Sequence, residues 1–186
     1  MMEQKRFAGM NVGAELIRQG SLQAGKALST HYRVECVRAD EVIWTDEFDN
    51  LVVTAGLNDS LDKHFKGSGY TAAWYVGLTD GTPTFAAGDA QAGHAGWVEV
   101  TDYDEATREA LVLGSVAAGS VDNSASKAEF TMNASVTVGG AFLSTTSTIG
   151  GSVDTLYGGG AFTAGDRSVV NDDLLRVTVT LTAAAA

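Results

Sequence analysis

Residues 128–138 alternate strictly between apolar and polar side chains, and this pattern constrains the fold more than any other feature of the sequence. Successive side chains of a β-strand point to opposite faces, whereas a helix would spread the same residues around its circumference. The stretch therefore predicts one long strand with a buried face and a solvent face. Residues 174–182 repeat the alternation. Two half-buried strands need further strands to cover them, which predicts a sandwich.

Shorter periodic segments lie between turn signals along the rest of the chain. Residues 31–37 and 41–45 predict a hairpin with its turn near residues 39–40. Residues 72–78 form an almost continuous apolar run, which is typical of a central strand buried on both faces. We expect about eight or nine strands in all, a count that favours a mainly β fold. The predicted architecture is an antiparallel β-sandwich with jelly-roll-like or related topology.

One short helix is predicted over residues 54–66. Thr54 is the expected N-cap, and two glycines after residue 66 end the helix. Its apolar residues recur at every fourth position and form a single stripe, which we expect to dock on the sheet. The stripe consists of Leu57, Leu61 and Phe65.

The first 29 residues differ from the rest of the chain. Four glycines discourage a helix longer than a short piece over residues 14–19, because each costs about 1 kcal/mol relative to alanine. We interpret residues 1–29 as an extended N-terminal arm and residues 30–186 as one β-sandwich domain. Such an arm lies on its own domain, lies on a partner, or is disordered, and the sequence leaves these three alternatives open.

The formal net charge is −11, and it is unevenly distributed. The arm carries four basic and two acidic residues, so the domain is strongly acidic. An acidic surface repels a phosphate backbone, so we expect no nucleic-acid partner. No apolar run approaches the roughly 20 residues that span a bilayer, and the N-terminus lacks the apolar segment of a secretory signal, so we expect no membrane association. The weakly basic arm is compatible with docking onto another protein. The alternative is that so small an excess of positive charge carries no information.

The residues that usually carry catalysis or bind metals are not grouped in the sequence. The three histidines, at positions 31, 64 and 94, are too far apart for metal-ligand spacing, and there is no nucleophile-elbow motif. The acidic clusters at 46–49 and 102–105 are typical of turns, although converging carboxylates can also bind calcium. Cys36 lies in an alternating segment and is expected to be a small buried residue. We therefore expect no catalytic residue, no cofactor and no metal site, and we interpret the protein as a non-enzyme.

Aromatic residues bracket a long loop over residues 79–96. Trp74 and Tyr75 precede the loop and Trp97 follows it. Core packing is the favoured interpretation, and a subunit interface is the alternative, because tryptophan and tyrosine are enriched at interfaces. Loops of this length are usually functional or form interfaces.

Several short motifs occur in an order that resembles one class of proteins. Residues 50–58 read Asn-Leu-Val-Val-Thr-Ala-Gly-Leu-Asn and precede the predicted helix. Residues 74–78 (Trp-Tyr-Val-Gly-Leu) follow, then a Gly/Pro loop and the pairs Gly88-Asp89 and Gly96-Trp97. The chain continues with Ala141-Phe142-Leu143, Gly150-Gly151, Leu156-Tyr157, and Asp172-Asp173 before a Val/Thr-alternating strand. Over residues 44–182 this order resembles tailed-bacteriophage virion structural proteins.

The resemblance implies a non-enzymatic virion protein, and capsid decoration (cement) is the leading hypothesis. The alternatives are a head fibre, a tail-fibre or baseplate-associated module, or a carbohydrate-binding adhesin that uses the aromatic residues. The implied partners are the major capsid protein or other virion proteins and further copies of the chain. The implied location is the virion, assembled in the bacterial cytoplasm, which suits a chain with one cysteine. The expected assembly interface comprises Phe7, Met10, Leu16, Ile17, Leu22, Trp74, Tyr75, Pro83, Phe85 and Trp97.

Overall fold

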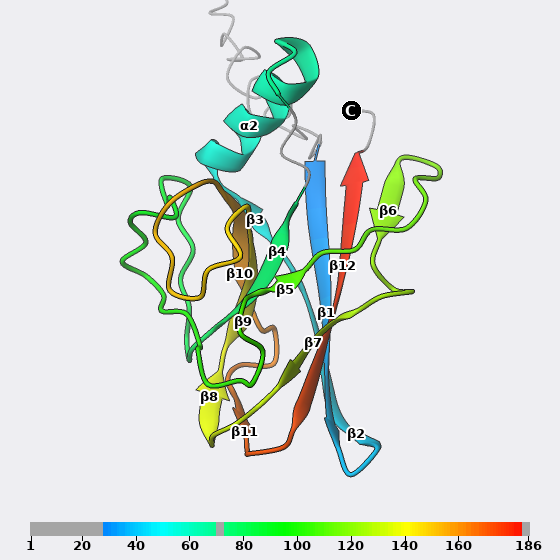
Figure 1. The fold of residues 1–186 in the computed structure, drawn as a ribbon, viewed down its shortest axis with the longest axis vertical. Helices are drawn as coiled ribbons and strands as arrows, with labels where there is room; N and C mark the ends of the chain where they lie inside the picture. Colours follow the sequence, from blue (N-terminus) through cyan, green and yellow to red (C-terminus); the bar gives the residue numbers. More distant parts are fainter. Residues whose placement is uncertain (1–27, 70–72, 184–186) are drawn as a thin grey trace, which may run out of the picture.

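The computed structural model describes residues 28–69 and 73–183, and the fold is mainly β, as predicted (Figure 1). Two five-stranded antiparallel sheets and one two-stranded sheet make up the described part of the chain, together with the single helix α2 (Thr54–Phe65). Nearly all of the predicted arm lies outside the described residues. The jelly-roll-like connectivity stays a prediction.

The first sheet is built on the pairing of an early strand with a late one. β1 (Leu28–Arg38) pairs along almost its whole length with β12 (Leu174–Ala183). β2 (Glu41–Asp49) lies on the outer side of β1, and β6 (Ser120–Asp122) and β7 (Ala128–Thr131) both pair with β12. The predicted hairpin is therefore confirmed, and its turn residues Ala39 and Asp40 both have positive φ.

The second sheet has the strand order β3-β10-β9-β4-β5. Its strands are β3 (Leu51–Val52), β10 (Leu156–Ala161), β9 (Gly140–Ser144), β4 (Tyr75–Thr79) and β5 (Glu109–Ala110). β4 lies between two neighbours, and its last four residues are buried, which confirms the prediction of a central strand.

The main hydrophobic core lies between the two sheets. Alternate residues of β1 and β12 face Val76 and Leu78 of β4 and residues of β9. Burial of each large apolar side chain contributes roughly 1.5–3 kcal/mol, so this alternation specifies which face of each strand is inside. A smaller cluster of Val53, Trp97, Phe142 and Leu156 lies on the other side of the second sheet.

The prediction of one long strand over residues 128–138 is wrong, although its burial pattern is confirmed. The even positions are buried or half-buried, whereas the odd positions are more exposed. β7 ends at Thr131, because its partner β12 begins at Leu174, the residue paired with Thr131. The Met132 N–H then donates to the Asp173 carbonyl, outside the sheet. The chain resumes as β8 (Val136–Val138), which pairs with β11 (Arg167–Val169) in the two-stranded sheet.

The helix begins and ends close to the predicted residues, but its orientation differs from the prediction. Val53 is the N-cap, and no side chain caps the helix. The expected docking stripe is exposed instead: Leu57, Leu61 and Phe65 are 43%, 56% and 76% accessible. α2 approaches β10 through Gly56, where a Cβ atom would lie 2.4 Å from the Tyr157 carbonyl oxygen. The smallest residue of the helix, rather than its largest, therefore makes the close contact.

Candidate functional site

The predicted interface residues of the long loop pack against the second sheet. Trp97 is only 4% exposed, and its ring stacks on Phe85 at 5.1 Å and on His94 at 3.6 Å between ring centroids. Its indole N–H donates to Asp89 Oδ2 at 3.2 Å. Pro83 is also buried, whereas Phe85 is half-buried. Core packing, the favoured sequence interpretation, therefore describes Trp97, and neither Trp97 nor Pro83 presents much surface to a partner.

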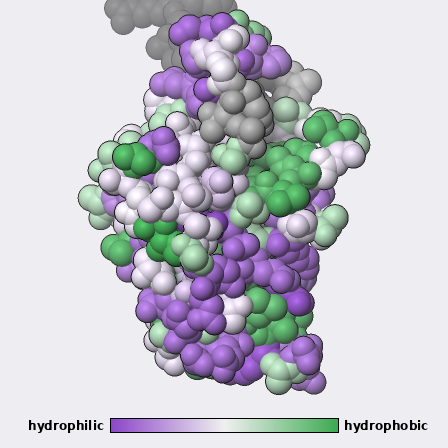
Figure 2. All heavy atoms as spheres, viewed as in Figure 1, coloured by the Kyte–Doolittle hydropathy of each residue, from purple (hydrophilic) through white to green (hydrophobic). Residues whose placement is uncertain are grey.

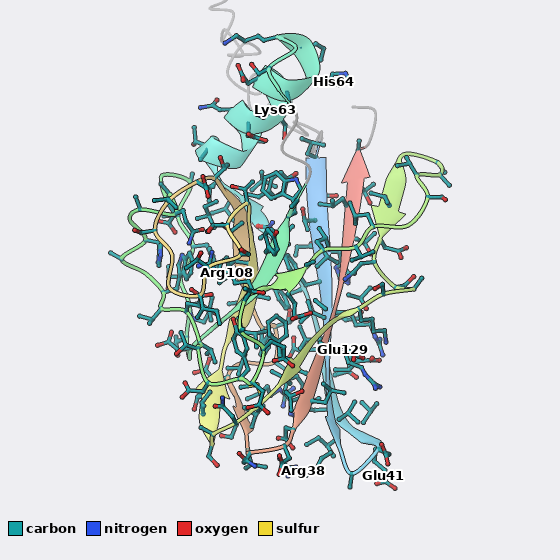
Figure 3. The ribbon with its side chains drawn as sticks, viewed as in Figure 1. Arg38, Glu41, Lys63, His64, Arg108 and Glu129 are labelled. Atoms are coloured by element: carbon teal, nitrogen blue, oxygen red, sulfur yellow. The ribbon has the colours of Figure 1, made fainter. Side chains whose placement is uncertain are left out.

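A buried ion pair ties the segment that follows this loop, residues 97–108, to a second loop at residues 145–151. The Arg108 side chain is fully buried and donates from Nε and Nη2 to the two Glu99 carboxylate oxygens at 2.6 and 2.7 Å. Nη1 donates to the Thr146 carbonyl at 3.1 Å, and Glu99 also accepts the Gly150 N–H at 2.7 Å. Figure 3 shows Arg108 on the loop side of the second sheet. Every strong contact of this pair is internal, so its role is structural.

Trp74 and Tyr75 are half-buried and lie at the end of the sandwich that carries α2. The Trp74 ring meets Tyr157 edge to face at 5.5 Å. The Trp74 and Tyr157 rings line a cavity of about 360 Å³, together with Leu28 and with Lys63 and His64 of α2. Figure 3 shows Lys63 and His64 on α2, at the end of the molecule opposite Arg38 and Glu41.

A larger apolar groove, which we call the α2 groove, opens between α2 and β3. It has a volume of about 740 Å³. Helix residues form one wall, and residues of β3 with Leu28 form the other. Its lining residues are Leu28, Asn50, Leu51, Val52, Leu57, Ser60, Leu61, His64 and Phe65. Contiguous exposed apolar residues often mark a surface that binds a protein, a membrane or a ligand.

Apolar surface continues beside Leu28 on the other sheet. A cavity of about 220 Å³ is lined there by Leu28, Val116, Val121 and Leu181, among others. Figure 2 shows a hydrophobic patch over the upper parts of β12 and β6, close to this position. The described chain thus begins where three apolar hollows meet. The spacing of Leu57, Leu61 and Phe65 predicted a stripe on α2 that would pack on the core, whereas no sequence pattern marks the residues of the opposite walls.

The charged clusters that the sequence singled out are used within the fold. Asp46 is buried and accepts hydrogen bonds from the Thr163 and Ala164 N–H groups at 2.9 and 3.2 Å. Glu105 accepts the Thr131 N–H. The prediction of a turn at residues 46–49 is wrong, because Asp46 lies in β2, from which its carboxylate holds the turn at residues 163–164. Glu105 ties its own loop to the end of β7.

Cys36 is buried beside Asp173, and burial raises the pKa of its thiol to about 12. The Arg38 guanidinium hydrogen-bonds the buried Asp173 carboxylate at 2.6 and 2.7 Å and lowers its pKa. A thiol with a raised pKa is a poor nucleophile at neutral pH.

The three histidines remain apart: His31 pairs with Asp49, His64 lines the α2 groove, and His94 stacks on Trp97. Within residues 28–69 and 73–183, no group of three or more His, Cys, Asp or Glu side chains has a metal-binding arrangement. In the same part of the chain, no helix is long and apolar enough to cross a membrane.

No protein-family model matches the sequence, and no curated protein matches it.

Proposed function

We propose that this protein is a non-enzymatic structural component of a tailed-bacteriophage virion, and that it binds the head as a capsid decoration (cement) protein. The proposal rests on the order of motifs described above. It also rests on where those motifs lie, because segments far apart in the sequence meet in one unit of the fold.

The observation that carries the proposal is the convergence of three motifs around β10. The Val53 N–H, from the first motif, donates to the Tyr157 carbonyl at 3.0 Å. Gly56 of the same motif approaches the Tyr157 backbone. The Trp-Tyr-Val-Gly-Leu motif contributes most of β4, which joins β10 through β9. The motifs therefore belong to one folded unit in which their contacts support one another.

The surface suits a protein that binds neighbours. Exposed apolar side chains outside the α2 groove, among them Val112, Leu113 and Val116, provide apolar area of the kind found at the centres of protein interfaces. The remainder of the surface is acidic, which favours a protein partner over packaged nucleic acid. The adhesin hypothesis is weakened, because Trp97 is buried and its indole N–H is already bonded within the chain.

The test adds purified protein to heads of the corresponding phage prepared without it. Light scattering after size-exclusion chromatography first gives the oligomeric state of the free protein. Saturable addition to heads, in a copy number that matches equivalent lattice sites, would support decoration. Heads that already carry the protein are the matched control, because their sites are filled.

Two results would contradict decoration. If an oligomer binds tails but not heads, the protein is a tail component rather than a decoration protein. A monomer that binds neither particle would remove the virion proposal altogether.

A further inference from the structure

The α2 groove has no cover among the described residues. Leu57, Leu61 and Phe65 follow one another along one side of the helix, and Leu51 on β3 is 41% exposed. A helix usually turns such a stripe toward a partner, and here the partner is not the sheet. Among the described residues, the groove is therefore an apolar surface without a packing partner.

The described part of the chain begins at this groove. Leu28, the first described residue, lines the α2 groove and both neighbouring cavities. β1 runs from Leu28 away from α2, so the residues before Leu28 start at the helix end of the sandwich (Figure 1).

Residues 1–27 have suitable length and composition. Their large apolar residues nearest to Leu28 are Leu22, Ile17 and Leu16, six to twelve positions upstream. An extended chain covers about 3.3 Å per residue, so these side chains reach roughly 20–40 Å from Leu28. The helix has 12 residues, which corresponds to a length of about 18 Å. The whole groove is within reach.

The same chain is a better occupant than a second copy. A tethered segment meets its site at an effective concentration on the order of millimolar, far above that of a free protein in solution. Charge also favours the contact: residues 1–27 carry Lys5, Arg6, Arg18 and Lys26 against two acidic residues, whereas the remaining chain holds 8 of the 12 basic and 21 of the 23 acidic residues. A weakly basic segment on an acidic domain is attracted rather than repelled.

We propose that residues 16–22 of the same chain pack into the α2 groove and cover Leu57, Leu61 and Phe65. The contact seals the open end of the sandwich and holds α2 against β10. It concerns the isolated chain and does not depend on the virion function.

The first test compares hydrogen exchange of α2 in full-length variants. Replacing Leu16, Ile17 and Leu22 together by serine removes the proposed cover, and we expect the amides of α2 to exchange about tenfold faster or more. The control replaces Phe7 and Met10 by serine, which makes a similar change farther from Leu28 and leaves exchange of α2 unchanged. Circular dichroism checks that both variants keep the β fold. Unchanged exchange in the triple variant, or equal acceleration in the control, would overturn the assignment.

The second test distinguishes the same chain from a neighbouring copy. Ile17→Cys and Leu61→Cys are introduced into the full chain with Cys36→Ala, and the protein is oxidised at several concentrations. We expect an intramolecular disulfide whose yield does not depend on protein concentration. Disulfide-linked dimers, with a yield that rises with concentration, would overturn the intramolecular contact in favour of exchange between copies. No disulfide of either kind would overturn the contact itself.

Discussion

Glu99→Gln tests whether burial, rather than distance, decides what an ion pair contributes to this fold. In the protein, the fully buried Arg108 side chain is neutralised by a carboxylate that is itself only 7% exposed. Glutamine keeps one acceptor oxygen but presents an amide donor to the guanidinium. The substitution therefore leaves an uncompensated charge with no access to water.

The expected loss is large. Breaking one partner of a buried pair typically costs about 3–5 kcal/mol, which for a protein of this size lowers Tm by roughly 6–20 °C. The matched control is Glu47→Gln: Arg33 and Glu47 lie at the same 2.6 Å, but their side chains are 44% and 50% exposed. Exposed pairs contribute about 0–1 kcal/mol, so the control should change little.

The assay is equilibrium urea unfolding at pH 7, followed by tryptophan fluorescence, with thermal unfolding as a second measurement. The double variant Glu99→Leu with Arg108→Met removes both charges, and we expect it to be more stable than Glu99→Gln, because a buried apolar pair leaves no unpaired ion. A loss below about 1 kcal/mol for Glu99→Gln would refute the reasoning, since that is the value of an exposed pair. A double variant less stable than the single one would refute it as well.

Three further predictions follow from close contacts and buried groups. Gly56→Ala places a Cβ 2.4 Å from a backbone oxygen of β10, so urea unfolding should show a loss of about 1–3 kcal/mol, whereas Gly69→Ala, which meets nothing within 4 Å, should be nearly neutral. Arg38 lowers the pKa of Asp173 below its ordinary 3.8, so this pair stabilises the fold above that pH and the contribution is lost as pH falls through the lowered pKa; the stability of Asp173→Asn, measured between pH 6 and about pH 2, should fall less steeply than that of the wild type. The Cys36 thiol, with a pKa of about 12, should react with a thiol reagent at pH 8 only after denaturant is added, and rapid labelling of the native protein would contradict its burial.

The sequence predicted the features of the fold that depend on one strand and its two faces. The alternation over residues 128–138 correctly indicated which side chains are buried. It could not indicate that the strand changes sheets, because that depends on where the partner strand β12 begins. Alternation is a local property, whereas pairing is decided by residues more than 40 positions away.

The candidate site was less predictable for a similar reason. Spacing alone shows that Leu57, Leu61 and Phe65 share one side of a helix, but it does not show what that side faces. Gly56 decides the question, because the closest approach of α2 to the sheet is possible only where there is no side chain. Trp97 illustrates the opposite case: the favoured interpretation, core packing, describes it, and its place beside a long loop said nothing about exposure.

The pairing of β1 with β12 has a consequence for how the protein is made. Ten residue pairs join the two strands, from Leu28 with Ala183 to Val37 with Leu174. A ribosome adds about 5–20 residues each second, so the β1–β2 hairpin waits roughly 7–30 s before its central neighbour emerges. During that interval the edge of β1 that later pairs with β12 has no partner strand. Folding of the first sheet is therefore an event that follows synthesis of nearly the whole domain, as expected for a sheet built on a non-local strand pair.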